Sequence, residues 1–313
     1  MLAARTVENQ NESFSLLLPN LFIGLCKGAR NLGDYSRIFK GELGYLIFKF
    51  EPSFKTFAAG RINPDVIIIS NNVENTLIIE WTESNHVNED KKKQIDRYSK
   101  LSRDDLINIV AIPVKSAKTH DIILITLPNS VSSYSEYMKL RDIRFPILDF
   151  TIQDGNYCLE KKESNFEESR TNKFFTDGIK IKRIPLHYIP IPLDNFSSKS
   201  IVTLVVRHLV SLLIKGIQEF SIEEFCEGYI SAWKFINDKK QSEFMKVTKN
   251  LLNELAHRPI GDQIIARIGN NPPKWKIKDE IDIKKRMKSI QKALNSFIIE
   301  IKEDRPYQLE MSI

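Results

Sequence analysis

Two carboxylates on neighbouring predicted strands are the side chains best suited to chemistry. Asp65 follows Pro64 at the start of one apolar run, and Glu80 ends the next apolar run fifteen residues later. A short turn between two antiparallel strands brings both carboxylates to the same end of a hairpin. Two carboxylates around one point form a hard oxygen site suited to Mg²⁺ or Mn²⁺. A cation held there lowers the pKa of an attacking water and neutralises charge on a phosphodiester.

A charged helix, predicted from about residue 88 to residue 101, follows this hairpin and carries further polar side chains. Gln94 and Tyr98 are four residues apart and therefore share one helix face. Lys91, three residues before Gln94, falls on the same face, whereas Lys92 and Lys93 point away from it. We expect this face to shape the site at the two carboxylates.

The motifs in order are Pro64-Asp65, then Leu77-Ile78-Ile79-Glu80-Trp81-Thr82, then Gln94-Ile95-Asp96-Arg97-Tyr98. From about residue 36 to residue 150 this order resembles the PD-(D/E)XK nuclease superfamily, and the last motif is similar to the QxxxY tail of its RecB-like exonuclease branch. The resemblance implies that Asp65, Glu80 and the backbone carbonyl of Trp81 bind the metal. It also implies an acidic residue on the first helix, for which Glu42 is the candidate, although the adjoining residues 45–50 also fit a strand.

One position departs from the pattern of that superfamily. The family lysine belongs two residues after the glutamate, where this sequence has Thr82. In the family this lysine orients the attacking water and stabilises charge in the transition state. Because Lys91 shares a helix face with Gln94 and Tyr98, we expect it to replace the missing lysine.

The elements that must position these residues predict an α/β core with a mixed central sheet. The expected strands are 66–69, 76–79, 107–114, 121–127 and 146–152, and a helix is expected at 132–140. Residues 159–174 are highly charged and predict a surface excursion. The proline-rich stretch 184–193 leads to a linker at 194–198. We therefore place a nuclease-like domain at residues 1–195.

The rest of the chain predicts a mostly helical domain at 196–280 and a C-terminal helix at 281–313. The order is a helix at 199–215, a strand and capped helix start at 220–225, a helix at 242–256, and strands at 263–268 and 274–278. This order resembles a winged helix-turn-helix, which implies contacts to DNA phosphates. A winged helix that binds protein is the alternative. The expected phosphate contacts are Lys246, Lys249, Arg267, Lys274 and Lys276, with Arg258 and Lys278 beside the wing.

Composition places the chain among ordinary globular proteins. Of 313 residues, 42% are hydrophobic and 27% are charged, which is typical of two soluble domains. The three cysteines lie far apart without a CxxC pair, which excludes an ordinary zinc finger and argues against a disulfide scaffold. With no signal peptide and no apolar run long enough to span a membrane, we expect a cytoplasmic protein.

The positive charge is concentrated in the second part of the chain. From Phe196 onward 20 Lys and Arg face 15 Asp and Glu, whereas the residues before it contain 26 and 25, respectively. Such an imbalance is typical of a protein that binds an anionic partner, although a protein with a basic surface and no partner has the same composition. No P-loop motif is present, so energy from ATP would have to come from another protein.

Together these patterns predict a Mg²⁺- or Mn²⁺-dependent DNA endonuclease. The layout resembles TnsA-like transposon nucleases and some anti-phage restriction nucleases, which is an analogy of architecture. The expected partners are DNA, a protein that supplies ATPase or recognition activity, and a second copy of the chain. The alternative is a DNA-binding or assembly subunit with a degenerate nuclease core, which Thr82 favours. RNA as the substrate also stays open.

Overall fold

The computed structural model describes residues 14–186, 188–189, 197–217, 219–258, 264–269, 274–277 and 283–303, without the side chains of residues 283–289. The chain folds into two compact units. The first extends to Tyr188 and includes Phe235–Asn237, and the second begins at Ile189 and resumes at Asp238. The linker predicted at 194–198 lies mostly outside the described residues.

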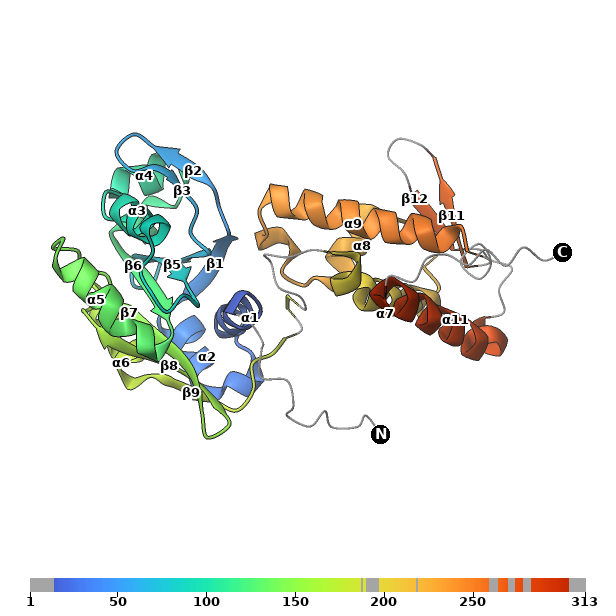
Figure 1. The fold of residues 1–313 in the computed structure, drawn as a ribbon, viewed down its shortest axis with the longest axis horizontal. Helices are drawn as coiled ribbons and strands as arrows, with labels where there is room; N and C mark the ends of the chain where they lie inside the picture. The colour runs from blue at the N-terminus through green and yellow to red at the C-terminus, as the bar shows by residue number, and fades with distance from the viewer. Residues whose placement is uncertain are drawn as a thin grey trace. The chain divides into compact units, whose positions relative to one another are not determined.

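A seven-stranded mixed sheet forms the centre of the first unit (Figure 1). Its spatial order is β1 (Tyr45–Phe50), β4 (Val66–Ser70), β5 (Asn75–Trp81), β6 (Thr119–Thr126), β7 (Ile147–Gln153), β8 (Asn156–Glu163) and β9 (Ile179–Ile181). Strands β5, β6 and β7 are parallel, and the other neighbours are antiparallel. The α/β class and the mixed central sheet predicted from the sequence are therefore confirmed.

Helices cover both faces of this sheet. One face buries Ile67, Ile78, Ile122 and Leu124 beneath α3 (Glu89–Tyr98), α4 (Arg103–Asn108) and α5 (Val131–Lys139). The opposite face is covered by α1 (Phe14–Lys27), whose Phe14 packs edge-on against Phe150 of β7. The short elements η1 (Arg30–Leu32), α2 (Gly33–Ser36) and η2 (Arg37–Glu42) lead into β1, and α6 (Ser169–Asp177) precedes β9.

Two predicted segments have a different structure. Residues 107–114, expected as a buried strand, contain the end of α4, a turn and the start of η3 (Val114–Ala117). The reason is local, because Ser102 and Asp105 form a capping box that begins a helix. Residues 159–174, expected as a surface excursion, contain most of β8 and the start of α6. Strand β8 pairs with both β7 and β9, which an exposed charged sequence does not reveal.

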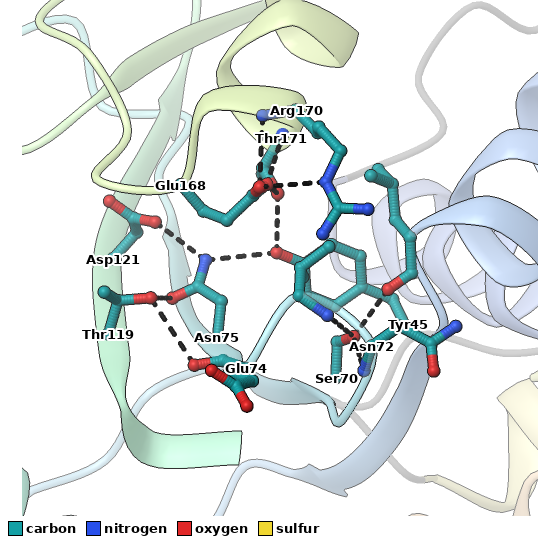
Figure 2. Close-up of polar contacts among 12 residues, drawn as sticks. Tyr45, Ser70, Asn72, Glu74, Asn75, Thr119, Asp121, Glu168, Arg170 and Thr171 are labelled. Atoms are coloured by element: carbon teal, nitrogen blue, oxygen red, sulfur yellow. Dashed lines mark hydrogen bonds and ion pairs between the residues drawn. The ribbon is translucent and has the colours of Figure 1, made fainter. Parts of the chain in front are cut away.

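A polar network joins β1, β5, β6 and α6 at the amino-terminal end of β5 (Figure 2). The Asn75 amide donates to Tyr45 Oη over 3.1 Å and to Asp121 Oδ2 over 2.9 Å, and it accepts from Thr119 Oγ1 over 3.0 Å. Tyr45 Oη also lies 2.7 Å from Thr171 Oγ1. Because its buried polar groups are paired, we interpret this network as structural.

In the part of the second unit that the structure describes, helical elements surround a small sheet. In chain order they are α7 (Ser198–Lys215), β10 (Glu219–Ser221), α8 (Ile222–Tyr229), η5 (Trp233–Phe235, whose last residue belongs to the first unit), α9 (Asp238–Ala256), β11 (Ile265–Ile268), β12 (Lys274–Ile277) and α11 (Ile283–Glu303). The sheet order is β10-β12-β11, and both pairs are antiparallel. This element order agrees with the order predicted from the sequence.

Aromatic side chains build the core of the second unit. Trp275 of β12 stacks on Phe220 of β10, with ring centroids 6.2 Å apart. His208 of α7 packs against Phe225 and Tyr229, and burial lowers the pKa of its imidazole to about 4. His208 is half-buried, so it packs at the edge of this core and the prediction of a core residue holds only in part.

Other sequence expectations can also be compared with the structure. Cys26, Cys158 and Cys226 are buried and free of disulfides. No helix in the described part of the chain combines the length and the apolar character that a bilayer crossing requires.

Candidate active site

Strands β4 and β5 place Asp65 and Glu80 opposite each other. Asp65 immediately precedes β4, and its backbone N–H donates to Ile79 O over 3.0 Å. Since Val66 pairs with Ile79, the antiparallel register puts Asp65 across from Glu80, on the face covered by α3. The Asp65 carboxylate accepts a 2.7 Å hydrogen bond from the backbone N–H of Trp81. The sheet therefore fixes both carboxylates at one end of the hairpin.

Helix α3 directs three side chains toward Glu80. The Lys91 ammonium donates to Glu80 Oε1, and the Tyr98 hydroxyl donates to Glu80 Oε2 over 2.8 Å. The amide of Gln94 in turn donates to Tyr98 Oη over 3.2 Å. Asn88 caps the helix by accepting from the backbone N–H of Lys91 over 2.9 Å, which fixes where the helix begins. The structure thus brings together Lys91, Gln94 and Tyr98, the three residues that helical spacing had placed on one face.

The neighbouring lysines do not enter this cluster. Lys92 forms an exposed ion pair with Glu89 over 2.7 Å, and Lys93 is exposed on another side of α3. Thr82 is buried, its backbone N–H donates to Ile125 O over 2.9 Å, and its hydroxyl accepts from Ser84 N over 3.2 Å. Thr82 therefore serves the connection between β5 and α3, and Lys91 is the cation that reaches Glu80.

The electrostatics of the site are those of crowded negative charge. Burial, together with the charge of Glu80, raises the pKa of the Asp65 carboxyl well above its usual range. The Trp81 N–H and the Lys91 ammonium oppose this rise, and the charge of Glu51 adds to it. Burial and the two carboxylates also raise the pKa of Tyr98, which keeps its phenol neutral and able to donate.

The donor set agrees in part with the predicted metal site. Mg²⁺ is commonly bound through one or two carboxylates, with waters and substrate phosphates completing its octahedron. The carboxylates of Asp65 and Glu80 and the Trp81 carbonyl are oxygen donors of the type in that description, and burial together with Glu80 raises the pKa of Asp65. Within the described ranges, no three His, Cys, Asp or Glu side chains gather closely enough to hold a metal by themselves. The side chains that the structure describes at this point therefore supply only part of a coordination shell.

Glu42, predicted as a further metal ligand, lies elsewhere. It ends η2, is exposed, and pairs with Arg37 over 2.7 Å. The strand that follows pairs Tyr45 with Ser70, whereas Asp65 lies beyond the opposite end of β4. That antiparallel register separates Glu42 from Asp65 by the length of the strand, so the prediction is wrong.

Glu51 is the carboxylate that the sequence analysis missed. It follows β1 directly, and its backbone N–H donates to Asp65 O over 2.8 Å. Its φ of 44° is uncommon for a residue other than glycine and marks a tight turn beside the site. Only the pairing of β1 with β4 reveals this position, because Phe50 pairs with Val66.

A pocket of about 270 Å³ adjoins the cluster. It shares Gln94 and Tyr98 with the cluster and lies between α3 and the end of the short hairpin formed by β2 (Phe54–Thr56) and β3 (Gly60–Ile62). Its other lining residues are Arg61, Ile62, Asn63, Asp90, Lys93 and Arg97.

Comparison with known proteins identifies the family of the first unit. Residues 16–189, more than half of the chain, match the family model of the MJECL32 domain. This chain belongs to the MJECL32 domain family. Asp65, Glu80 and the α3 cluster all lie within its MJECL32 domain. Residues 195–311 match a second family, described as a domain of unknown function (DUF8601). No curated protein and no solved structure matches the chain.

The basic residues predicted to contact nucleic acid lie outside the MJECL32 domain, in the second unit. Lys246 and Lys249 are one turn apart on α9, and Lys246 is exposed. Lys274 and Lys276 alternate along β12 and so share one face of the small sheet. Arg267 is paired directly with the buried Trp275 and therefore belongs to the opposite face. The predicted set is thus divided between two faces of the sheet.

Two further cations were expected near that sheet. Arg258 forms ion pairs with Glu254, over 3.0 Å, and with Glu300, which occupy its guanidinium within the unit. The expectation that it contacts phosphate is therefore not supported by its position. Lys278 lies outside the described residues.

Proposed function

We propose that this protein is a metal-dependent deoxyribonuclease of the PD-(D/E)XK type that hydrolyses phosphodiester bonds within DNA. The observation that carries the proposal is the arrangement around Glu80. Asp65 lies opposite this carboxylate, and Lys91 and Tyr98 bind its two oxygens. The sequence order of hairpin and helix and their spatial convergence both support the same chemistry.

Asp65, Glu80 and the Trp81 carbonyl would hold Mg²⁺ or Mn²⁺, which supplies a more acidic water and neutralises charge on the phosphodiester. Lys91 reaches the same carboxylate from α3, so its ammonium is placed to orient the attacking water and to stabilise negative charge on phosphate. The neutral Tyr98 fixes the orientation of Glu80, and Gln94 fixes Tyr98. The side chains proposed to act on the substrate or the metal are thus oriented by hydrogen bonds from neighbouring side chains.

For the second unit we propose a winged-helix domain that delivers DNA to the MJECL32 domain. The order α7, β10, α8, α9, β11, β12 and the sheet order β10-β12-β11 support this proposal. The exposed lysines of α9 and β12 would contact backbone phosphates. We place the enzyme in the cytoplasm, in a mobile-element or anti-phage setting with a partner protein, by analogy of layout.

Incubation of the purified protein with supercoiled plasmid and Mg²⁺ or Mn²⁺ tests this function. We expect nicking or linearisation that requires the metal and that Asp65→Asn and Glu80→Gln abolish. Lys91→Ala should reduce the rate at least a hundredfold, on the order of what one lost electrostatic contact costs. Lys92→Ala is the matched control and should cut normally, because Lys92 pairs with Glu89 away from the site. Full activity of Lys91→Ala would exclude its role.

A second candidate is a DNA-binding or assembly subunit with a degenerate nuclease core. Two observations favour it: Thr82 stands in place of the family lysine, and both Glu80 oxygens already accept hydrogen bonds. Calorimetry with Mn²⁺ separates the candidates. A wild-type protein with an active site binds Mn²⁺, and Asp65→Asn abolishes that binding. A protein with a degenerate site binds no Mn²⁺, so the mutation changes nothing in the titration.

A further inference from the structure

The hairpin between β1 and β4 presents an unusual side chain to solvent. Phe57, at its tip, is fully exposed, more so than any other large apolar residue that the structure describes. The two strands pair Phe54 with Ile62 and Lys55 with Arg61. Directly opposite residues point to the same side, so Lys55 and Arg61 form a pair of exposed cations one step from the tip.

This hairpin is firmly seated, so the exposure of Phe57 is not a consequence of loose packing. Ala59 and Ile62 are buried in the hydrophobic cluster that contains Tyr98. The turn is closed by a 2.9 Å hydrogen bond from Ala59 N to Thr56 Oγ1. An aromatic ring held in water on a rigid turn loses little conformational entropy when it stacks on a ligand.

The pocket beside the hairpin is positively charged. Arg61 comes from β3, while Lys93 and Arg97 lie four residues apart on one face of α3. Among the residues that the structure describes, none forms an ion pair with these three cations, and Asp90 is the one carboxylate in the lining. A pocket with three unpaired cations and a single carboxylate favours an anion.

The pocket and the carboxylate cluster share a wall. Gln94 and Tyr98 line the pocket, and the Tyr98 hydroxyl donates to Glu80. A nucleic-acid backbone bound at the carboxylates would therefore reach the pocket with its neighbouring phosphates. Phe57 lies at the tip of the same hairpin that supplies Arg61 to the pocket.

We propose that the pocket and the hairpin tip form a binding site for one single strand of DNA, in which Arg61, Lys93 and Arg97 bind backbone phosphates and Phe57 stacks on a base. Cationic grooves combined with exposed aromatic rings are the general means of holding single strands. An unpaired base offers Phe57 a free ring face, whereas bases within a duplex are already stacked. The identity of the ligand as DNA rests on the proposed function.

Binding without hydrolysis tests the site in the full-length protein. The probe is a fluorescein-labelled thymidine oligomer of about 12 nucleotides, in EDTA, followed by anisotropy at several KCl concentrations. Phe57→Ala should weaken binding about fivefold or more without changing the salt dependence, and Phe57→Trp should restore it. The triple variant Arg61→Ala/Lys93→Ala/Arg97→Ala should lower the slope of log affinity against log salt by about 2.

The matched control removes three other exposed cations of the same unit, near the start of β6 and β7: Lys115→Ala/Lys139→Ala/Arg144→Ala. Equal losses in the two triple variants would overturn the assignment, since only the net charge would then matter. Asp90→Asn should tighten binding, because it removes the carboxylate from the pocket. A duplex of the same length that binds with the same dependence on Phe57 would overturn the single-strand assignment.

Photocrosslinking locates the strand independently of affinity. An oligomer that contains 5-iododeoxyuridine is irradiated with the protein, and the crosslinked peptide is identified by mass spectrometry. We expect the peptide that contains Phe57, and crosslinks confined to the second unit would overturn the proposal. The two proposals can fail independently. If the protein binds the oligomer through Phe57 but cuts no DNA, the binding site is supported and the nuclease proposal is wrong. If the protein cuts DNA and all pocket variants bind and cut normally, the binding-site proposal is wrong.

Discussion

At the scale of single residues, the central feature is a pair of carboxylates that repel each other. The pKa of Asp65 is raised by burial and by Glu80, so the folded protein favours its protonated form more than the unfolded chain does. Stability linked to this group is present at low pH and is lost as the pH rises through the folded-state pKa. Above that folded-state pKa, ionised Asp65 lies buried beside Glu80 and destabilises the fold, and added positive charge relieves this.

We predict that Asp65→Asn raises the melting temperature at pH 7 by about 2–4 °C, the change that about 1 kcal/mol produces in a domain of this size. The gain should shrink as the pH falls, because the wild-type carboxyl is then protonated as well. Mn²⁺ should raise the melting temperature of the wild type but not of this variant. Differential scanning fluorimetry measures both effects. Asp177→Asn, an exposed change on α6, is the control, and a less stable Asp65→Asn would contradict the prediction.

The ion pair between Lys91 and Glu80 leads to a second prediction. The two side chains are 19% and 9% exposed, respectively, so Glu80 loses a largely buried partner in Lys91→Ala. We expect a loss of about 2–3 kcal/mol of unfolding free energy, between the values for exposed and buried pairs. Lys92→Ala breaks an exposed pair and should cost less than about 1 kcal/mol. Urea denaturation measures both, and equal losses would count against the pairing.

At the scale of elements, the two ends of β5 have different polar clusters. Glu80 lies at one end, and the network of Asn75, Tyr45 and Asp121 lies at the other. Burial raises the pKa of Asp121 to about 6, while its hydrogen bonds from Glu167 N and Asn75 oppose that rise. This end of the sheet is therefore pH-sensitive even though its hydrogen bonds are complete.

We predict that the wild type loses about 2–3 kcal/mol of stability through Asp121 as the pH rises from about 4 to about 7. The sign follows from a folded-state pKa above the ordinary value of 3.8. Asp121→Asn should be less stable at pH 4, since an amide cannot accept both hydrogen bonds, but should lack this pH dependence. Urea denaturation at a series of pH values compares the slopes. Parallel curves for the two proteins would show that Asp121 does not titrate in this range.

The elements around the site could be predicted because their signals are local. The apolar runs of β4 and β5 have strand length, and the i, i+4 spacing on α3 places Gln94 with Tyr98. The strand predicted at residues 107–114 was wrong. Its apolar residues match the pattern of a buried strand, but the capping box upstream begins a helix. Glu51 and Glu42 could not be assigned correctly, since their places depend on the register of β1 with β4, a pairing between distant residues.

At the scale of the whole molecule, the two family matches and the two compact units divide the chain in a similar place. Most of the net positive charge of +6 belongs to the second part of the sequence. The carboxylate cluster belongs to the first. We therefore expect the proposed hydrolysis on the first unit and the main electrostatic attraction for nucleic acid on the second.

We predict that Lys274→Ala/Lys276→Ala weakens duplex DNA binding and lowers its salt slope by about 1.8, because both lysines lie on one face of β12. Lys292→Ala/Lys302→Ala on α11, with the same loss of charge, should change the slope little. Arg267→Ala should add nothing to the first variant, since Arg267 lies on the other face of the sheet. Anisotropy titrations in KCl measure these slopes, and a large effect of Arg267→Ala would favour a different binding face.

The hydrogen bond from Glu51 N to Asp65 O has a consequence for replacement of the hairpin. It brings the two ends of segment 52–64 together in the sheet, so strand pairing, and not the conformation of that segment, sets the position of Asp65. Ala59 and Ile62 are buried in the core cluster, and Phe54 packs against it, so this segment is anchored through few side chains. Replacement of this hairpin is therefore expected to change what the neighbouring pocket binds, while the pairing of β4 with β5 keeps Asp65 across from Glu80.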